Sequence, residues 1–138
     1  MRLEVVLAAH ARRTPDKELL VCDGRRVTYR DMQQRIREVA GGLAKLGLGE
    51  GDRIVLYLPN GVEIVELLYA AFTLGVIAIP VTTRITIREL TYFCQDSGAK
   101  IVVCSPQHAE GVRGILDGQP GLQGITTGAA EKGLLAFA

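Results

Sequence analysis

Two different spacings of apolar residues alternate along the chain. Between residues 29 and 46 apolar side chains recur every three or four positions, at Tyr29, Met32, Ile36, Val39, Ala40 and Leu43. This spacing is typical of a helix that buries one face. Residues 53–58 (RIVLYL) are instead apolar at almost every successive position. That second pattern predicts a parallel strand buried on both faces.

The remaining segments predict further elements of both kinds. Helices are expected at residues 3–13, 29–46, 62–74, 87–97 and 107–116. Strands are expected at residues 18–22, 26–28, 53–58, 76–80, 100–104 and 122–126. The first two strands flank Asp23-Gly24, a dipeptide favoured in tight hairpin turns. Three helices are expected to begin with a capping box, formed by the pairs Thr28 and Asp31, Asn60 and Glu63, and Thr86 and Glu89.

The order of these elements predicts the fold class. Strands that alternate with helices through short turns are joined by right-handed crossovers, which make the strands parallel. The sequence therefore predicts an α/β fold with an open, doubly wound, mostly parallel sheet. This is a Rossmann-like three-layer α/β/α arrangement with a small N-terminal β-hairpin. The length matches one domain, so residues 1–138 are expected to form a single α/β subdomain.

Composition and charge argue against several classes of partner. The chain has 16 basic and 15 acidic residues, which gives no electrostatic reason to expect nucleic acid or an anionic membrane. The longest apolar run, residues 64–79, is interrupted by Glu66, Thr73 and Gly75 and predicts no transmembrane segment. No apolar signal segment follows Met1, so a cytoplasmic protein is expected.

A search for chemical motifs assigns no catalytic residue and no metal ligand. No predicted strand is followed by a GxGxxG or GxxxxGK loop, and there is no nucleophile elbow. His10 and His108 have no Cys, Asp or Glu at ligand spacing and are expected to be solvent-exposed. Cys22, Cys94 and Cys104 lack CxxC spacing and are expected to be core thiols. From its residues alone, this segment is therefore predicted to be a structural scaffold without catalytic motifs.

An apolar segment ends the sequence. Residues 133–138 (GLLAFA) come shortly after the last predicted core strand. Two interpretations stay open: a helix that lacks partners, or a natural chain that continues beyond Ala138, which the uncovered apolar surface favours. The same surface predicts self-association through Leu134–Phe137 and Leu122–Thr126.

Seven short motifs occur in order along the chain: Thr28-Tyr29, Leu46-Gly47-Leu48, Gly51-Asp52-Arg53, Leu58-Pro59-Asn60, Gly75 to Pro80, Arg84 to Leu90, and Asp96 to Lys100. Their order and spacing resemble the N-terminal portion of an AMP-forming acyl-CoA synthetase, of the adenylate-forming (AMP-binding) enzyme superfamily. The sequence departs from that pattern at residues 80–83 (PVTT), at Ile87 and at Met32. These changes lie in loops and helix starts, so they concern the subfamily and not the fold.

The resemblance implies that residues 1–138 are the N-terminal part of a longer ligase. Such an enzyme converts a carboxylic acid, ATP and CoA into acyl-CoA, AMP and pyrophosphate through an acyl-adenylate, with Mg²⁺ as cofactor. Fatty-acid metabolism is its expected setting. The family's phosphate loop, acidic residues and catalytic lysine lie beyond Ala138, so the 138-residue chain alone is expected to bind no cofactor and to be inactive. An adenylation domain that loads a carrier protein, and a free-standing α/β binding or interaction module, stay open as alternatives.

The resemblance also implies one binding surface. In some CoA-forming members the nucleotide end of CoA rests on the loop after the second buried strand and on an arginine of a later helix. By position these residues are Thr82, Thr83, Arg84 and Arg113. Arginine suits this role because its guanidinium group forms forked hydrogen bonds with phosphate. The alternative, that Arg84 and Arg113 are solvated residues beside helices, stays open.

Overall fold

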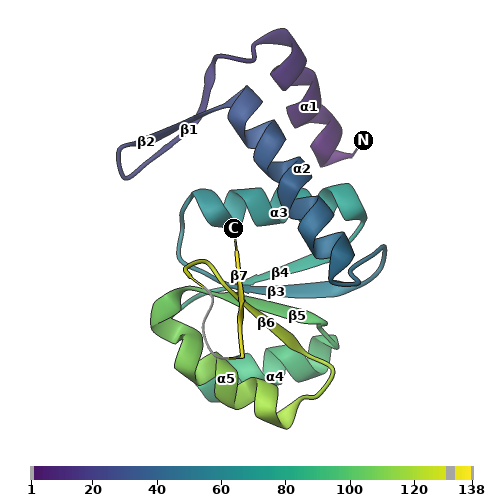
Figure 1. The fold of residues 1–138 in the computed structure, drawn as a ribbon, viewed down its shortest axis with the longest axis vertical. Coiled ribbons are helices and arrows are strands. Elements are labelled where there is room, and N and C mark those ends of the chain that lie inside the picture. The colour runs from purple at the N-terminus through teal and green to yellow at the C-terminus, as the bar shows by residue number, and fades with distance from the viewer. Residues whose placement is uncertain (1, 130–132, 138) are drawn as a thin grey trace. The chain divides into compact units, whose positions relative to one another are not determined.

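The computed structural model describes residues 2–129 and 133–137 (Figure 1). The chain divides into two units. The helical unit comprises Met1–Glu50 and Asn60–Val76, and the sheet unit comprises Gly51–Pro59 and Ile77–Ala138. No helix in the described ranges is long and apolar enough to cross a membrane. The expectation that residues 1–138 are a single subdomain of a longer protein stays a prediction.

The helical unit consists of helices and a hairpin. Its helices are α1 (Leu3–Arg13), α2 (Tyr29–Lys45) and α3 (Val62–Leu74), and its strands are β1 (Glu18–Cys22) and β2 (Arg25–Thr28). The two strands pair antiparallel across Asp23-Gly24. The φ angles of these two residues, 50° and 77°, are positive as the primed hairpin turn requires. The predicted hairpin is confirmed.

Two of the predicted capping boxes are confirmed. The Thr28 hydroxyl accepts a hydrogen bond from the backbone of Asp31, whose carboxylate in turn accepts one from the backbone of Thr28. Thr86 and Glu89 open helix α4 (Ile87–Ser97) of the sheet unit in the same way. These hydrogen bonds lower the pKa of both the Asp31 and the Glu89 carboxyl groups, since they stabilise the charged form.

The third predicted capping box, at the start of α3, is wrong. The residue that precedes the helix is Gly61, and no side chain caps the first turn. Asn60 therefore lies one position too early to serve as the cap. Glu63 is then the second helical residue and not the third, so it cannot close a capping box. Its carboxylate lies 3.4 Å from the guanidinium group of Arg25 on the hairpin.

The core of the helical unit forms between α2, its neighbouring helices and the hairpin. Helix α2 contacts both α1 and α3, as well as the two strands. The buried apolar residues of this core are Leu7, Val27, Met32, Ile36 and Val62. Met32, Ile36 and the other buried residues of α2 recur at helical spacing, so the apolar stripe predicted for residues 29–46 is the buried face.

The helical unit also buries one carboxylate. Glu66 of α3 is 2% exposed, and its carboxylate lies 3.3 Å from the Arg35 guanidinium group and 3.9 Å from that of Arg25. Burial by itself would lower the pKa of Arg35, but hydrogen bonds and charges from Glu66 and Glu38 outweigh that effect and raise it. The Arg35 guanidinium group therefore stays charged, and its ion pair with Glu66 links α2 to α3.

The sheet unit is built on five parallel strands among its described residues. The strands are β3 (Arg53–Tyr57), β4 (Ile77–Val81), β5 (Ile101–Cys104), β6 (Gln123–Thr126) and β7 (Leu135–Ala136), in the spatial order β4-β3-β5-β6-β7. Each neighbouring pair is parallel. Its helices are α4 and α5 (Ala109–Gly118). The predicted α/β class, with a mostly parallel sheet and a hairpin, is confirmed.

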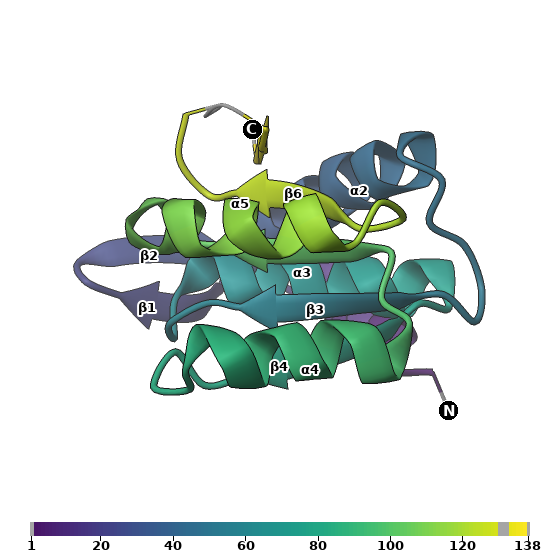
Figure 2. The ribbon, with the colours of Figure 1, turned by 90° about the horizontal axis from the view of Figure 1, so that it is seen from below.

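Helices α4 and α5 lie side by side over one face of this sheet (Figure 2). The strand residues that pack in this core alternate along the chain, as Val55 and Tyr57 do in β3. Leu90 and Cys94 of α4 and Val112 of α5 lie against them and are almost fully buried. Burial raises the pKa of the Cys94 thiol to about 11. The core is therefore mostly aliphatic, and its side chains are neutral.

Two of the motifs noted in the sequence contact each other in the sheet unit. Arg53 at the start of β3 donates hydrogen bonds to the carbonyl oxygens of Ser97, at 2.6 Å, and Gly98, at 3.0 Å. These carbonyls end helix α4, so the guanidinium group satisfies acceptors that the helix leaves free. Asp52 forms an ion pair with Lys100 at 2.8 Å. Both motifs thus fix α4 and β5 relative to β3.

The end of the described chain is a strand, and the helix considered for this segment is wrong. Leu135 and Ala136 form β7, which extends the sheet beside β6. Leu134 is 4% exposed because its side chain enters the core against Gly124, where a Cβ atom would collide with it. Residues 130–132 and 138 of this segment lie outside the described residues. Self-association stays a prediction, but the surface named for it is largely buried, since Leu122, Ile125 and Leu134 are at most 7% exposed. Leu135 is the exposed large apolar side chain of those segments in the described part of the chain.

Candidate functional site

The order of the strands reverses beside β3. From β3 the chain passes to β4 on one side of the sheet and then to β5 on the other. In open α/β sheets ligands bind outside the carboxyl ends of the strands, at such a switch point. The candidate site is therefore the edge formed by the ends of β3 and β5 and by the loop that follows β4.

Three polar side chains, which we name the switch-point cluster, lie at this edge. Tyr57 is the last residue of β3, while Ser105 and His108 come directly after β5. The Ser105 hydroxyl oxygen lies 3.0 Å from Nδ1 of His108. The rings of Tyr57 and His108 are tilted by 51°, with their centroids 4.7 Å apart. The imidazole ring is thus held on two sides.

The tyrosine of this cluster also shapes the loop after β4. Its hydroxyl group donates to the carbonyl oxygens of Thr83 and Ile85, each at 3.4 Å. The Thr82 hydroxyl accepts a hydrogen bond from the backbone N–H of Arg84 at 3.3 Å. Burial, with a smaller contribution from Cys104, raises the pKa of Tyr57. The phenol therefore stays protonated and remains a donor.

The switch-point cluster suits binding better than covalent catalysis. If the Ser105 hydroxyl donates to Nδ1, the proton of the imidazole resides on Nε2, and the reverse holds if Nδ1 donates. In the described part of the chain no carboxylate is hydrogen-bonded to His108, so the base of a Ser-His-Asp arrangement has no orienting acid. What remains is a ring for stacking and one imidazole nitrogen for a hydrogen bond.

The four residues suggested for CoA come from two parts of the sheet unit. Thr82, Thr83 and Arg84 lie in the loop after β4, at one edge of the sheet. Arg113 of α5 instead lines a cavity of about 440 Å³ together with Gly133, which comes just before β7 at the other edge. Arg84 is exposed, and its guanidinium group has no hydrogen-bonding or ionic partner among residues 2–129 and 133–137. Their role in binding CoA stays a prediction.

Sequence reasoning missed the switch-point cluster. His108 was expected to be solvent-exposed, but it is half-buried between Ser105 and Tyr57, so that expectation is wrong. His10 is exposed as predicted. The expected helix at 107–116 actually begins at Ala109, after a 3₁₀ turn that ends at His108. A serine and a histidine three residues apart after a buried strand were the available signal.

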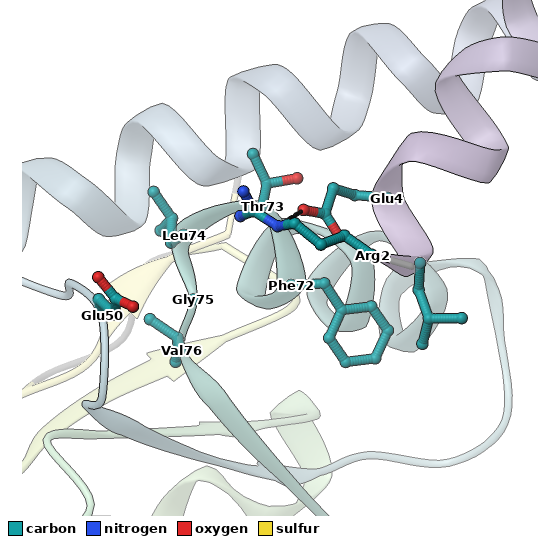
Figure 3. Close-up of a pocket in the computed structure, with 9 residues that line it drawn as sticks. Arg2, Glu4, Glu50, Phe72, Thr73, Leu74, Gly75 and Val76 are labelled. Atoms are coloured by element: carbon teal, nitrogen blue, oxygen red, sulfur yellow. Dashed lines mark ion pairs between the residues drawn. The ribbon is translucent and has the colours of Figure 1, made fainter.

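The helical unit has its own hollow, which is less promising as a site. It has a volume of about 630 Å³ and lies between the start of α1 and the end of α3 (Figure 3). Arg2 and Glu4 form an ion pair at 2.6 Å on its wall, and Glu50 contributes a second carboxylate. Phe72 and Val76 supply apolar surface. Among the described residues of its lining, the one basic side chain, Arg2, is already paired with a carboxylate of the same wall.

A metal site has no candidate in the described ranges. No group of three or more His, Cys, Asp or Glu side chains in residues 2–129 and 133–137 is arranged to hold an ion. Cys94 and Cys104 are buried as free thiols, and Cys22 is half-buried. Cys94 and Cys104 are thus the core thiols that were expected, whereas Cys22 lies only partly buried.

Comparisons with known proteins agree on one family. The family model described as AMP-binding enzyme matches residues 7–133. Pyochelin synthase PchD of Pseudomonas aeruginosa is 41% identical over 100 residues, which are 70% of this chain and 18% of that protein. Long-chain-fatty-acid–CoA ligase FadD13 of Mycobacterium tuberculosis is 40% identical over 78 residues, which are 56% of this chain and 16% of that protein.

A solved structure gives the same result at the level of the fold. A Rhodopseudomonas palustris protein, described as a candidate long-chain-fatty-acid CoA ligase, superposes with a TM-score of 0.93 at 28% identity. The superposition covers 99% of this chain and 35% of that one. The chain thus spans less than a fifth of the two curated relatives and about a third of this structure.

Proposed function

Because the chain belongs to the AMP-binding enzyme family, we propose that it is the N-terminal part of an ATP-dependent acyl-CoA synthetase. A substrate carboxylate attacks the α-phosphate of ATP, which releases pyrophosphate and leaves an acyl-adenylate. The CoA thiol then attacks the acyl carbon and displaces AMP, which yields the thioester. The observation that carries this proposal is the likeness, over nearly the whole chain, to the Rhodopseudomonas palustris CoA-ligase structure.

Besides its acid the reaction uses Mg²⁺, ATP and CoA, and the described residues of this chain offer a surface that fits CoA. Within residues 2–129 and 133–137 Mg²⁺ finds no ligand set, and no glycine-rich phosphate loop follows a strand to hold ATP. The proposal therefore assigns both sites to the rest of the enzyme. The CoA nucleotide has a fitting surface, since Thr82 and Thr83 offer hydroxyl groups and Arg84 an exposed guanidinium group.

The proposal is tested by the gene region that follows codon 138. A Ser/Thr/Gly-rich phosphate loop within a few dozen codons is expected. The complete product is then assayed for carboxylate-dependent ATP–pyrophosphate exchange and for acyl-CoA formation over a panel of fatty and aromatic acids. A stop codon directly after Ala138 would overturn the proposal and leave a free-standing α/β module.

A second candidate function is the loading of a carrier protein. The similarity to pyochelin synthase PchD, a relative that is not named as a CoA ligase, favours it. The two functions share adenylation and differ in the thiol that accepts the acyl group. Transfer of the acyl group to free CoA supports the first proposal, whereas transfer only to a phosphopantetheinylated carrier protein supports the second.

Three further expectations belong to this proposal. The 138-residue chain alone is expected to be inactive, and pyrophosphate exchange above that of a heat-denatured sample would contradict this. Self-association is expected because apolar side chains such as Leu135, Tyr92 and Ile77 are exposed. Sedimentation equilibrium at micromolar concentration measures it, and a monomer that binds no hydrophobic dye would exclude it. A cytoplasmic location is tested by cell fractionation.

A further inference from the structure

A basic groove runs between the first two helices of the helical unit. Its volume is about 480 Å³. Helix α1 contributes Ala8, Ala11 and Arg12, and helix α2 contributes Arg30, Gln33, Gln34 and Arg37. The lining therefore holds guanidinium and amide groups and small side chains, without any carboxylate. None of these residues belongs to the switch-point cluster or to the residues suggested for CoA.

The lining follows from helix geometry. Arg30, Gln33 and Arg37 are three and four positions apart on α2, so their side chains leave the helix on one side. The facing surface of α1 carries Ala8 and Ala11, whose short side chains leave the space open. Arg12 reaches the groove from the last turn of α1. Guanidinium groups thus come to the groove from both helices.

Two of the three arginines of this groove have no ion pair among the described residues, whereas four arginines elsewhere in the helical unit have one. Arg2, Arg25, Arg26 and Arg35 each form an ion pair with a glutamate. Arg12 and Arg37 are exposed, and neither has an ion pair within the described ranges.

The acidic residues nearest to the groove do not cancel its charge. Arg30 pairs with Asp16 at 2.9 Å, but both side chains are mostly exposed, at 61% and 83%, so water and salt screen this pair. Glu38 is already engaged by Arg35 and Gln34. The groove therefore keeps a positive potential.

We propose that this groove binds the phosphate group of an anionic ligand through Arg12 and Arg37, with Arg30 as the third cation. The planar guanidinium fork donates two parallel hydrogen bonds to phosphate oxygens. The amide groups of Gln33 and Gln34 add donors and acceptors for an ester or sugar oxygen. The volume exceeds what one phosphate group needs and accommodates a diphosphate or a small phosphate ester. The proposed anion binding does not depend on the acyl-transfer function proposed above.

Calorimetric titration of the 138-residue chain with sodium pyrophosphate at low ionic strength tests the proposal. Binding in the micromolar-to-millimolar range is expected, weakening as salt increases. Arg12→Ala combined with Arg37→Ala is expected to weaken it at least tenfold. Arg13→Ala, in the same turn of α1 but outside the groove lining, is the matched control and is expected to change it less than twofold. Thermal unfolding monitored by circular dichroism verifies that both variants fold.

Two further arms identify the source of the phosphate and its specificity. Vesicles of phosphatidylcholine with phosphatidylglycerol test a lipid headgroup, and pure phosphatidylcholine vesicles are their control. Binding to pyrophosphate or to the anionic vesicles that depends on Arg12 and Arg37 supports the proposal and names the source. Citrate that binds as tightly as pyrophosphate, an undiminished affinity in the double variant, or no binding in either arm would overturn it.

Discussion

The helical unit and the sheet unit handle buried polar groups in opposite ways. Among the described residues, the buried polar side chain of the helical unit is the charged Glu66, which arginines neutralise. Those of the sheet unit are Ser105 and Thr126, which are neutral. A buried charge needs a fixed partner and so ties neighbouring elements together. A buried hydroxyl needs only a hydrogen bond, such as the one between Ser105 and His108.

The surfaces of the two units differ in the same sense. Ion pairs of arginines are frequent in the helical unit, and the basic groove adds Arg12 and Arg37, which have none within the described ranges. In the sheet unit the polar groups collect at the carboxyl ends of the strands, as the switch-point rule predicts. The candidate binding region is thus a groove of arginines in the helical unit and the carboxyl ends of the strands in the sheet unit.

Removal of the buried carboxylate is the most direct way to break the helical unit. Glu66→Ala is expected to lower the free energy of unfolding by about 3 kcal/mol, because it removes the buried carboxylate that pairs with the partly buried Arg35. Urea unfolding followed by circular dichroism measures the change. Glu63→Ala removes an exposed pair and is expected to cost less than about 1 kcal/mol. Equal costs for the two variants would show that the buried charge contributes nothing special.

The corresponding test of the sheet unit concerns β7. Leu134→Ala is expected to cost about 2–3 kcal/mol, since its side chain fills the neutral core beside Gly124. Leu135→Ala, at the exposed neighbouring position, is expected to stay within about 0.5 kcal/mol. The same denaturant titration compares them. A negligible cost at Leu134 would mean that β7 does not stabilise the sheet.

The neutral core of the sheet unit also predicts an alkaline sensitivity. Cys94 has a pKa near 9 in the unfolded chain and of about 11 in the folded protein. The contribution of its neutral thiol to the free energy of unfolding is therefore complete below pH 9 and is lost as the pH rises toward 11. At pH 10 the loss is about 1.4 kcal/mol. Cys94→Ala is expected to flatten the decline in stability between pH 8 and pH 10 by that amount. An identical decline in the variant would contradict the assignment.

The smallest effect is expected at the switch-point cluster. Ser105→Ala removes the hydrogen bond to His108 and is expected to lower the free energy of unfolding by about 1 kcal/mol. Thr91→Ala removes a hydroxyl that bonds only within its own helix, to Ile87, and is the control with an expected change within about 0.5 kcal/mol. A Ser105→Ala variant as stable as the wild type would mean that the hydrogen bond between Ser105 and His108 does not stabilise the fold.

Much of the fold was predictable because its signals are local. The hairpin at Asp23-Gly24 and the capping boxes at Thr28 and Thr86 were predicted where the structure has them. The failure at Asn60 is one of register: the helix begins after Gly61, one residue later than predicted, so neither Asn60 nor Glu63 is at a capping-box position. The candidate site was predictable only in part: the loop at residues 82–84 was identified, and the switch-point cluster was not.

By itself the sequence determined the succession of helices and strands, the parallel sheet and the family, because periodicity, caps and motif spacing are properties of neighbouring residues. Only the tertiary structure decided which side chains meet. Ser105 and His108 approach Tyr57 because β3 and β5 are adjacent in the sheet, although some fifty residues separate them in the chain. Arg12 and Arg37 share a groove because α1 contacts α2. Neither meeting is encoded in local spacing, because each depends on how separate elements bury their apolar faces together.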